Sequence, residues 1–343
     1  MMKISPLRKE KIKEELLKFI EENRKDEYVK MPSERELSEN FGVSRTTIRS
    51  ALKEFINKGL LVQFQGKGTY ITPKPKEKNI NIITSPDIRS DDPFYTKFFL
   101  ELTRIATKEK IKIAFLNLES LPGDSQDSPL IMIGLIEESF IEKLRQIYKT
   151  LISIEQYLTH DEIIQISIDD YRMGWVAADT LINYGYRYLI HMAGPEKYTA
   201  PYLRKIGFLD RVNKEKGVEH QIIEGKMNWN SGYLLGKNII DIYDDVNEPL
   251  GVFAANDWMA IGLIQRLREG GIRVGEDISI IGCDDIPLSK EIVPSLTTFK
   301  WNIEGIIKEI IHLVNDIYIG KNTLNKRVLL SARLIVRESL VKR

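Results

Sequence analysis

The run Ser44-Arg-Thr-Thr-Ile-Arg49 holds the side chains most suited to chemistry in the first part of the chain. Arg45 and Arg49 each carry a planar guanidinium, which can grip a guanine edge or a pair of phosphate oxygens through two parallel hydrogen bonds. Thr46 and Thr47 are short, so the backbone that carries them can approach a partner closely. We interpret this run as the leading turns of a helix that reads the major groove of DNA.

Helix signals on both sides must position those side chains. Ser33 can cap a short helix with Leu37 as its apolar residue, and Gly42 supplies a tight turn. Ser44 then caps the second helix. The apolar face expected to pack opposite the arginines consists of Ile48, Leu52, Phe55 and Ile56.

A hairpin follows the second helix. Gly66-Lys67-Gly68 lies between the apolar runs 60–64 and 70–71, so glycines form the tip and Lys67 is available to phosphate. Helix, turn, helix and hairpin in this order predict an α+β winged helix-turn-helix. The residues that we predict to contact DNA are Arg35, Ser44, Arg45, Thr46, Thr47, Arg49, Gln65, Gly66, Lys67 and Gly68.

In this order of motifs, the segment from about 7 to 72 resembles the GntR family of bacterial regulators. Charge agrees with the resemblance, because residues 1–78 hold 18 Lys and Arg against 12 Asp and Glu, a net charge of +6, whereas the remainder carries −5. DNA affinity is therefore expected to come from this segment and to fall with added salt. The alternative is a small helical domain whose arginines are merely solvated.

Length and composition bound the rest of the chain. Its 343 residues, 43% of them hydrophobic, suffice for two or three compact units. No apolar run is long enough to span a membrane, the first residues do not form a signal sequence, and the single cysteine, Cys283, excludes an intrachain disulfide. We therefore expect a cytoplasmic protein without a membrane partner.

Beyond a proline-punctuated connector, short apolar runs alternate with amphipathic stretches. The runs that predict strands are 81–85, 111–117, 130–134, 151–154, 163–168, 188–193, 221–223, 251–254 and 278–282. The stretches that predict helices are 94–107, 137–148, 171–184, 198–215, 230–243 and 257–269. This alternation indicates an α/β fold with parallel sheets, helices on both faces, and ligands bound at the carboxyl ends of the strands, with two lobes around a cleft.

Several motifs in this region resemble the LacI/GalR family of sugar-responsive repressors, whose core looks like a periplasmic binding protein. They are Asp170-Tyr-Arg-Met-Gly174, Gly185-Tyr-Arg-Tyr-Leu-Ile190, Arg204-Lys-Ile-Gly-Phe208, Ala255-Asn-Asp-Trp-Met-Ala-Ile-Gly262, Asp277-Ile-Ser-Ile-Ile-Gly-Cys-Asp-Asp285, Pro294-Ser-Leu-Thr-Thr298 and Leu334-Ile-Val-Arg-Glu-Ser339. The resemblance covers roughly 80 to 340. A GntR-type reader on a LacI-type core is the plan of the arabinose repressors of bacilli.

The resemblances together imply domain limits. We expect a DNA-binding domain at 1–72, a linker at 73–79, and an effector-binding and dimerisation domain at 80–343. Within the last, the first lobe should comprise about 80–167 and 301–326, and the second about 168–300 and 327–343.

Two departures from the LacI pattern stand out. Only the segment 119–129 separates the second and third predicted strands, which is too short for the usual crossover helix and loops. In the linker, Pro73 and Pro75 oppose the hinge helix that LacI relatives insert into the minor groove. Ligand binding must therefore be communicated to DNA by another route.

Three polar residues match the positions with which the LacI family binds its effector: Arg204, Asn256 and Asp284. A guanidinium, an amide and a carboxylate can each pair with vicinal hydroxyls of a sugar. Asp284 directly follows a predicted strand, whereas the neighbouring Asp285 suits a loop cap. Asp257 is expected to cap the helix that follows it.

Two further carboxylates have two interpretations each. Glu155 aligns with a carboxylate that contacts ligand in some relatives, or it is simply solvated after its strand. Asp170 lies where the chain should cross between lobes, so it serves either as a hinge residue or as a ligand contact. The aromatic side chains of Phe94, Tyr95 and Trp301 either stack on a sugar ring or pack in the core.

Rival functions lack their motifs. An enzyme would need a nucleophile, metal or cofactor motif, yet the histidines are scattered and no metal-ligand spacing, phosphate loop or nucleophile elbow is present. We expect no catalytic residues, no cofactor and no metal site. A pyridoxal-phosphate aminotransferase-like domain, which some GntR-type heads carry, would need a longer chain, and an exported sugar-binding protein would need a signal sequence.

The sequence thus predicts a repressor of carbohydrate-use genes that a small sugar such as arabinose releases from operator DNA. We expect a homodimer on a palindromic operator, since two reading helices on a two-fold site give adequate specificity. Response to a non-sugar metabolite such as a nucleoside is the remaining alternative.

Overall fold

The computed structural model describes residues 6–74, 77–86, 88, 93–117, 121–122, 126–323 and 325–343. The chain forms two compact units, Met1–Glu77 and Lys78–Arg343. The predicted linker 73–79 contains the boundary between them, and its Pro75 lies outside the described residues. Among the described residues, no helix has both the length and the apolar character needed to cross a membrane.

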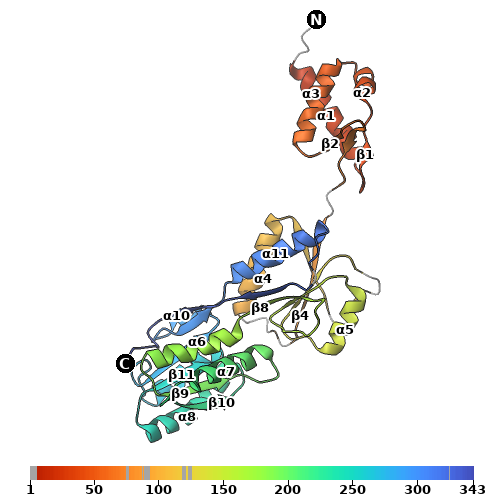
Figure 1. The fold of residues 1–343 in the computed structure, drawn as a ribbon. Coiled ribbons are helices and arrows are strands. Elements are labelled where there is room, and N and C mark those ends of the chain that lie inside the picture. The colour runs from red at the N-terminus through yellow and green to blue at the C-terminus, as the bar shows by residue number, and fades with distance from the viewer. Residues whose placement is uncertain are drawn as a thin grey trace. The chain divides into compact units, whose positions relative to one another are not determined.

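The smaller unit combines helices with a three-stranded antiparallel sheet of order β1-β3-β2 (Figure 1). Its elements are α1 Pro6–Asn23, β1 Val29–Lys30, α2 Glu34–Asn40, α3 Arg45–Asn57, β2 Leu61–Phe64 and β3 Gly68–Ile71. On α1, Ile12, Leu16 and Ile20 recur every four residues and are buried. They pack with the predicted apolar face of α3, of which only Ile56 is partly exposed.

The first lobe of the larger unit is built on a six-stranded parallel sheet of order β14-β8-β7-β6-β4-β5. Its strands are β4 Lys78–Thr84, β5 Ile111–Phe115, β6 Leu130–Ile133, β7 Leu151–Ile154, β8 Ile164–Ile168 and β14 Arg327–Leu330. Its helices are α4 Pro93–Lys108, α5 Glu138–Ile147 and α11 Ile303–Tyr318. Helix α11 packs beside α4 and against β4 (Figure 1).

The second lobe is built on a six-stranded sheet of order β10-β9-β11-β12-β13-β15. Its strands are β9 Tyr188–Ala193, β10 Glu219–Glu224, β11 Leu250–Ala254, β12 Ile278–Cys283, β13 Thr297–Lys300 and β15 Arg333–Ile335. Its helices are α6 Asp170–Asn183, α7 Thr199–Val212, α8 Trp229–Val246, α9 Asp257–Glu269 and α10 Leu288–Glu291. Only the edge pair β13 and β15 is antiparallel.

The chain crosses between the lobes after β8, after β13 and after β14. The last crossing lies further along the chain than the predicted lobe limit of 326. Strand β14 still pairs with β8 in the first-lobe sheet, because Val328 and Leu330 extend the apolar core there. The crossing consequently falls at 331–332, between β14 and β15.

The connection from β5 to β6 is as short as the sequence indicates. Its described residues, 116–117, 121–122 and 126–129, contain no helix. Its other residues lie outside the described part of the chain.

Two glycines allow α6 and α7 to pack closely. A Cβ atom built on Gly174 would lie 1.8 Å from the carbonyl oxygen of Arg204, and one on Gly207 would lie 1.9 Å from that of Tyr171. Any side chain at either position would therefore push the helices apart. This contact fixes Arg204 of α7 beside the start of α6.

The core of the second lobe contains a buried histidine. The His191 ring on β9 lies between Phe208 and Phe253, at centroid distances of 5.2 Å and 4.7 Å. Its Nδ1 lies 2.9 Å from the Phe253 carbonyl oxygen, while its buried Nε2 contacts no hydrogen-bonding group of the described residues. Burial lowers the pKa of His191 from 6.5 to about 4.

Acid should therefore destabilise this lobe through His191. Between pH 6.5 and about pH 4, His191 is protonated in the unfolded chain but still neutral in the native chain. The unfolded state therefore binds more protons, and the free energy of unfolding falls as the pH falls through this range. We expect the change from about pH 7.5 to about pH 5 to cost the wild type about 2 kcal/mol more than it costs His191→Phe. Urea unfolding at the two pH values measures the difference; equal losses in both proteins would contradict a neutral buried imidazole.

Candidate functional site

The helix-turn-helix presents the predicted arginines on an exposed face. Ser44 caps α3 by accepting a hydrogen bond from the Thr47 backbone N–H at 3.2 Å, and its hydroxyl also lies 2.9 Å from the Thr47 hydroxyl. Arg45, Thr46 and Arg49 are exposed on the first turns. Ser44 thus has a structural role as the helix cap, beside the DNA contact predicted from its position.

Arg49 is held in place by a partner that the sequence did not reveal. Its Nε and Nη2 donate to the Glu34 carboxylate at 2.9 Å and 2.6 Å, while the arginine side chain stays 70% exposed. Hydrogen bonds from Arg49 lower the pKa of Glu34. Because Glu34 uses one edge of the guanidinium, the other edge is left to face a partner.

Arg35 lies at the start of α2 and donates to Glu39 at 3.0 Å, one turn later on the same helix. Both side chains are exposed, so this pair contributes little to stability and can exchange for a phosphate contact. The preceding Ser33 and Glu36 form a reciprocal capping box that fixes the start of the helix.

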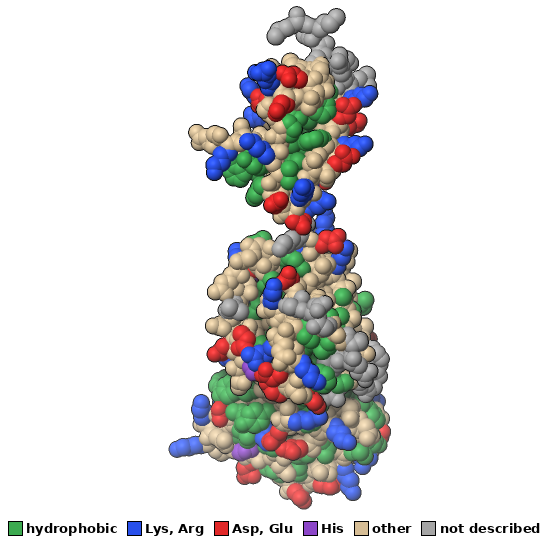
Figure 2. Space-filling model, turned by 90° about the vertical axis from the view of Figure 1, so that its right-hand side faces the viewer, with side chains coloured by type: hydrophobic (Ala, Val, Ile, Leu, Met, Phe, Trp, Pro, Cys, Tyr) green, Lys and Arg blue, Asp and Glu red, His purple; other side chains and the backbone are tan. Residues whose placement is uncertain are grey.

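The wing is the hairpin of β2 and β3, with Phe64 paired to Gly68. Gly66 and Gly68 have φ of +75° and +106°, which a side chain would strain, so both glycines are needed for this turn. Gln65 and Lys67 are exposed at the tip. Figure 2 shows basic side chains interspersed with acidic ones on the visible faces of both units. The predicted DNA interface therefore depends on the particular side chains of α3 and the wing more than on a uniformly basic surface.

A cleft between the lobes of the larger unit brings together the predicted effector residues. Its volume is about 280 Å³. The predicted residues that line it are Phe94, Tyr95, Glu155, Arg204, Asn256, Asp284 and Trp301. The lining residues that sequence reasoning missed include Gln156, Tyr198, Thr199 and Met227. Their position in the sequence could have identified them, because each follows the carboxyl end of a parallel strand, where such folds bind ligands.

Arg204 forms the floor of the cleft and is itself tied down. Its Nε donates to Asp170 at 2.8 Å and its Nη1 to the Ala255 carbonyl oxygen at 2.6 Å. The Arg204 and Asp170 side chains are each 3% exposed. Burial raises the pKa of Asp170, and the Arg204 charge opposes that rise. Asp170 therefore holds the arginine at the crossing into the second lobe and does not line the cleft.

Asn256 lines the cleft and also has the capping role that the sequence suggested for Asp257. Asn256 is the cap of α9, accepting from the Met259 N–H at 3.0 Å and donating to the Met227 carbonyl oxygen at 3.1 Å. The prediction that Asp257 caps this helix is wrong. Asp257 is fully buried, and its carboxylate accepts hydrogen bonds from the Ile286 backbone N–H and the Ser289 and Thr298 hydroxyls.

Asp284 and Asp285 diverge after β12. Asp284 lines the cleft with a φ of +116°. Asp285 instead pairs with Arg337 and Lys300, and its side chain is almost completely buried, so it is an ion-pair residue and not the loop cap that the sequence suggested. The backbone turn thus sends neighbouring carboxylates to different places.

An aromatic wall completes the cleft. The Trp301 ring lies 4.7 Å from Phe94, and Phe94 lies 5.1 Å from Tyr95, both edge to face. The Tyr95 hydroxyl donates to Glu155 at 2.9 Å. Trp301 is 7% exposed, and its indole N–H finds no acceptor among the described residues.

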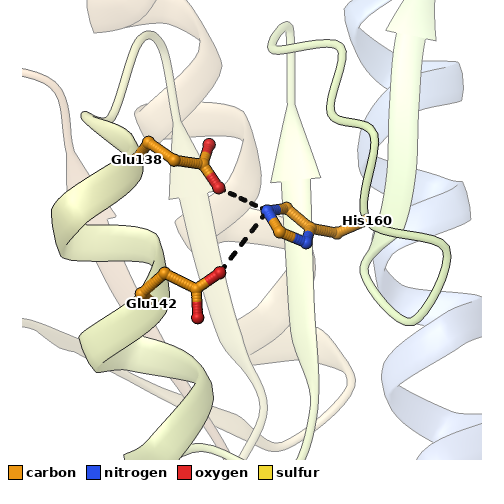
Figure 3. A group of neighbouring side chains, drawn as sticks. All are labelled: Glu138, Glu142 and His160. Atoms are coloured by element: carbon orange, nitrogen blue, oxygen red, sulfur yellow. Dashed lines mark hydrogen bonds and ion pairs between the residues drawn. The ribbon is translucent and has the colours of Figure 1, made fainter.

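Away from the cleft, Glu138, Glu142 and His160 gather on the first lobe (Figure 3). Their ligand atoms lie within 4.8 Å of one another, and His160 Nε2 contacts Glu138 and, at 3.8 Å, Glu142. Arg145 pairs with Glu142 and so already supplies a positive charge to the cluster. Since both glutamates are exposed, we interpret the group as surface ion pairs.

Comparison with known proteins agrees with both units. Residues 8–71 match the model of the gntR family of bacterial regulatory proteins, and residues 178–340 match that of a periplasmic binding protein-like domain. The HTH-type transcriptional regulator CelR of Thermobifida fusca is 29% identical over 52% of this chain, and the match spans only 52% of CelR.

Longer matches extend over both units or over the whole of a solved core. The arabinose metabolism transcriptional repressor of Geobacillus stearothermophilus is 24% identical, with 84% of this chain and 85% of that protein covered. A solved periplasmic binding protein/LacI transcriptional regulator from Alkaliphilus metalliredigens QYMF, complexed with D-xylulofuranose, is 25% identical with a TM-score of 0.62, covering 77% of this chain and 100% of that one.

Removing the partner of the buried arginine should destabilise the larger unit. Asp170→Asn leaves the Arg204 charge buried without its counterion, so we expect a loss of about 3 kcal/mol in the free energy of unfolding. Urea unfolding measures it, with the surface variant Asp210→Asn as control. The double change Asp170→Asn with Arg204→Met should recover part of the loss; a single variant as stable as the control would show that the pair is not needed.

Proposed function

We propose that the chain is a transcriptional regulator in which a GntR-type DNA-binding domain is joined to a LacI-like, periplasmic binding protein-like domain, and that it represses carbohydrate-use genes until a small sugar binds the cleft. Its relatives are transcriptional regulators and not enzymes. The observation that carries the proposal is a cleft lined by both lobes, with carboxylates, an amide and an aromatic wall, in a chain that also carries a DNA reader.

The chemistry of the cleft supports a sugar. Asp284 and Glu155 offer hydroxyl-binding oxygens, and the faces of Phe94 and Trp301 suit the C–H surface of a sugar ring. The relative named for arabinose metabolism and the neighbour solved with D-xylulofuranose favour a pentose, so L-arabinose is the first candidate.

We propose that the protein acts as a cytoplasmic homodimer on a palindromic operator. One helix-turn-helix reads only a few base pairs, so the affinity of a specific regulator requires a second copy related by two-fold symmetry. The linker prolines in the sequence oppose a hinge helix, so we propose that the larger unit acts on the reader through the linker by another route.

A mechanical route from cleft to linker supports this proposal. Trp301 in the cleft wall directly precedes α11. At the far end of α11, the Tyr318 hydroxyl bonds the backbone of Asn79, and Asn315 bonds Lys78. Lys78 and Asn79 begin β4 and are the last two residues of the predicted linker. Ligand-driven movement of α11 would thus be passed to the end of the linker.

A gel shift tests the proposal. The DNA is the region upstream of the genes that neighbour the gene for this chain, and binding is compared with and without pentoses and hexoses. Release by a sugar supports it. An operator complex that no sugar alters, together with release by a nucleoside or another metabolite, would replace the proposed effector class.

The reading arginines should control operator affinity. Arg45→Ala or Arg49→Ala removes a guanidinium from the exposed face of α3, so we expect operator binding to weaken by about 1 to 3 kcal/mol with sugar binding unchanged. Fluorescence anisotropy on operator and on scrambled DNA measures both affinity and specificity.

Lys67→Ala is the matched control for those variants. A phosphate contact at the wing tip should weaken binding to operator and scrambled DNA alike and reduce the salt dependence. Unchanged operator affinity in both arginine variants would remove α3 from the interface.

Loss of a cleft carboxylate should uncouple the switch. Asp284→Asn keeps a residue that tolerates positive φ but removes the charge, so we expect it to bind operator like the wild type and stay bound at sugar concentrations that release the wild type. A sugar titration of the operator complex measures this. Arg204 is the poorer target, because its removal would leave the buried Asp170 carboxylate without its counterion. A wild-type release curve for Asp284→Asn would assign Asp284 a purely structural role.

A further inference from the structure

Three aromatic side chains share the face of the β1-β3-β2 sheet that points away from the core of the smaller unit. Leu61 and Ile71 of this sheet are buried in that core. Because side chains alternate along a strand, Phe64 and Tyr70 point to the opposite face, where Tyr28 joins them. Tyr28 is 55% exposed and Phe64 is 40% exposed. The sheet therefore presents to solvent an aromatic face that consists of Tyr28, Phe64 and Tyr70.

The three rings hold one another in place. The Phe64 ring lies 5.7 Å from the Tyr28 ring and 5.3 Å from the Tyr70 ring, and both pairs meet edge to face at 76°. Such contacts favour one orientation of Phe64. Single exposed apolar side chains are normal on a protein surface, whereas a contiguous apolar patch with a polar rim marks a binding surface.

The aromatic face continues into the hairpin tip of the wing. Phe64 directly precedes Gln65 and pairs with Gly68 across the hairpin. An open hollow of about 550 Å³ lies here, lined by Gln63, Phe64, Gln65, Gly66 and Gly68. A Cβ atom added to Gly66 would meet no described atom within 4 Å, so another molecule can approach the backbone of the tip closely.

Basic groups lie on the tip side of the aromatic face. The Lys30 Cε lies 3.6 Å from the place where a Cβ atom of Gly68 would be, and Lys67 is exposed at the tip itself. The acidic residues Asp26 and Glu27 precede β1, at the end of the sheet away from the tip. Figure 2 shows hydrophobic side chains at the surface of this unit beside Lys and Arg side chains. An anionic partner is therefore drawn to the tip, with the aromatic face beside it.

We propose that this aromatic face docks on the deoxyribose rows of the DNA that the helix-turn-helix reads. Deoxyribose presents C–H edges between the phosphates, so Tyr28 and Phe64 cover apolar surface of the DNA backbone while Lys67 meets a phosphate. Tyr70 is only partly exposed and positions Phe64. Rings that contact sugars read no base edge, so this non-ionic contact strengthens binding to every sequence alike.

The wing tip favours DNA over a protein as the partner of this face. A protein seated on the rings alone would leave Lys67 and the open glycine backbone of the tip without a role. The backbone of duplex DNA offers phosphates to the tip and sugars to the rings at the same time.

The inference rests on the proposed DNA binding, and a salt series separates the two. Fluorescence anisotropy of the full chain would measure the affinity for the upstream DNA that the wild type binds, and for scrambled DNA of the same length, at several salt concentrations. We expect Phe64→Ser and Tyr28→Ser each to weaken both affinities roughly tenfold, because they cover less apolar surface. The slope of log affinity against log salt should stay that of the wild type, since no phosphate contact is lost.

Matched variants separate an apolar contact from other effects. Lys67→Ala should lower the salt slope by about one, as the loss of a phosphate contact does. Tyr202→Ser removes a tyrosine that is 42% exposed on α7 of the larger unit, and it should change neither affinity nor slope. Phe64→Leu keeps an apolar side chain and should retain most of the affinity. Circular dichroism and thermal unfolding verify that the variants are folded.

A photoreactive benzophenone side chain at position 64 identifies the partner directly. Irradiation of the DNA complex should cross-link the chain to DNA, because benzophenone reacts with C–H bonds that lie against it. A cross-link to a second copy of the chain would overturn the inference and assign the face to contact between protein molecules.

Wild-type affinity in both Phe64→Ser and Tyr28→Ser would also overturn the inference, and would leave the proposed regulator standing. A lower salt slope in these variants would show that a phosphate contact was lost, and would overturn the non-ionic role. A wild-type chain that binds none of the DNA fragments would overturn the proposed function, and the inference with it. The two failures are therefore distinct.

Discussion

The buried ion pair between Asp170 and Arg204 is the constraint on which the cleft depends. Asp170 is the first residue of α6, directly after a crossing between lobes, and Arg204 belongs to α7. The same guanidinium also bonds the Ala255 carbonyl at the end of β11 and lies 6.0 Å from the Trp301 ring. One side chain therefore joins a crossing, two helices, a strand end and the cleft wall.

Such a pair is costly to bury, so its geometry must be well satisfied. The glycine contacts between α6 and α7 supply that geometry, because they let the helix backbones approach until Arg204 reaches Asp170. Close packing and the ion pair require each other. Gly174 and Gly207 therefore serve the cleft by setting the separation of the two helices.

Periodicity in the sequence was sufficient for most of the fold. Strands β7 and β9 and helix α9 match their predicted limits, and the other predicted elements end within about three residues of the observed ones. Strand β14 was assigned to the wrong lobe because its four residues carry no signal of which sheet they join. That choice depends on pairing with β8, more than 150 residues away.

The side-chain roles were harder to predict for a related reason. The resemblance to the LacI family selected Arg204, Asn256 and Asp284, and the structure places all three at one cleft. It could not show that Asp170 is the counterion of Arg204, or that Glu34 grips Arg49, because these partners belong to different elements. The sequence also placed the cap of α9 at Asp257 instead of Asn256, where a shift of one residue separates the helix cap from a buried carboxylate.

The same arrangement offers the proposed ligand response a route to the DNA-binding domain without a hinge helix. The Arg204 guanidinium lies 6.0 Å from the Trp301 ring at the cleft, so a ligand that bridged Trp301 and the second lobe would bias the orientation of α11. Tyr318 and Asn315 at the end of that helix hold the first residues of β4. Because a ligand can shift an equilibrium only by its difference in affinity between two states, the contacts that count are those made to both lobes at once. Glu155 of one lobe and Asp284 of the other line the same cleft, so a ligand that touched both would make such contacts, and a ligand bound to either lobe alone would not.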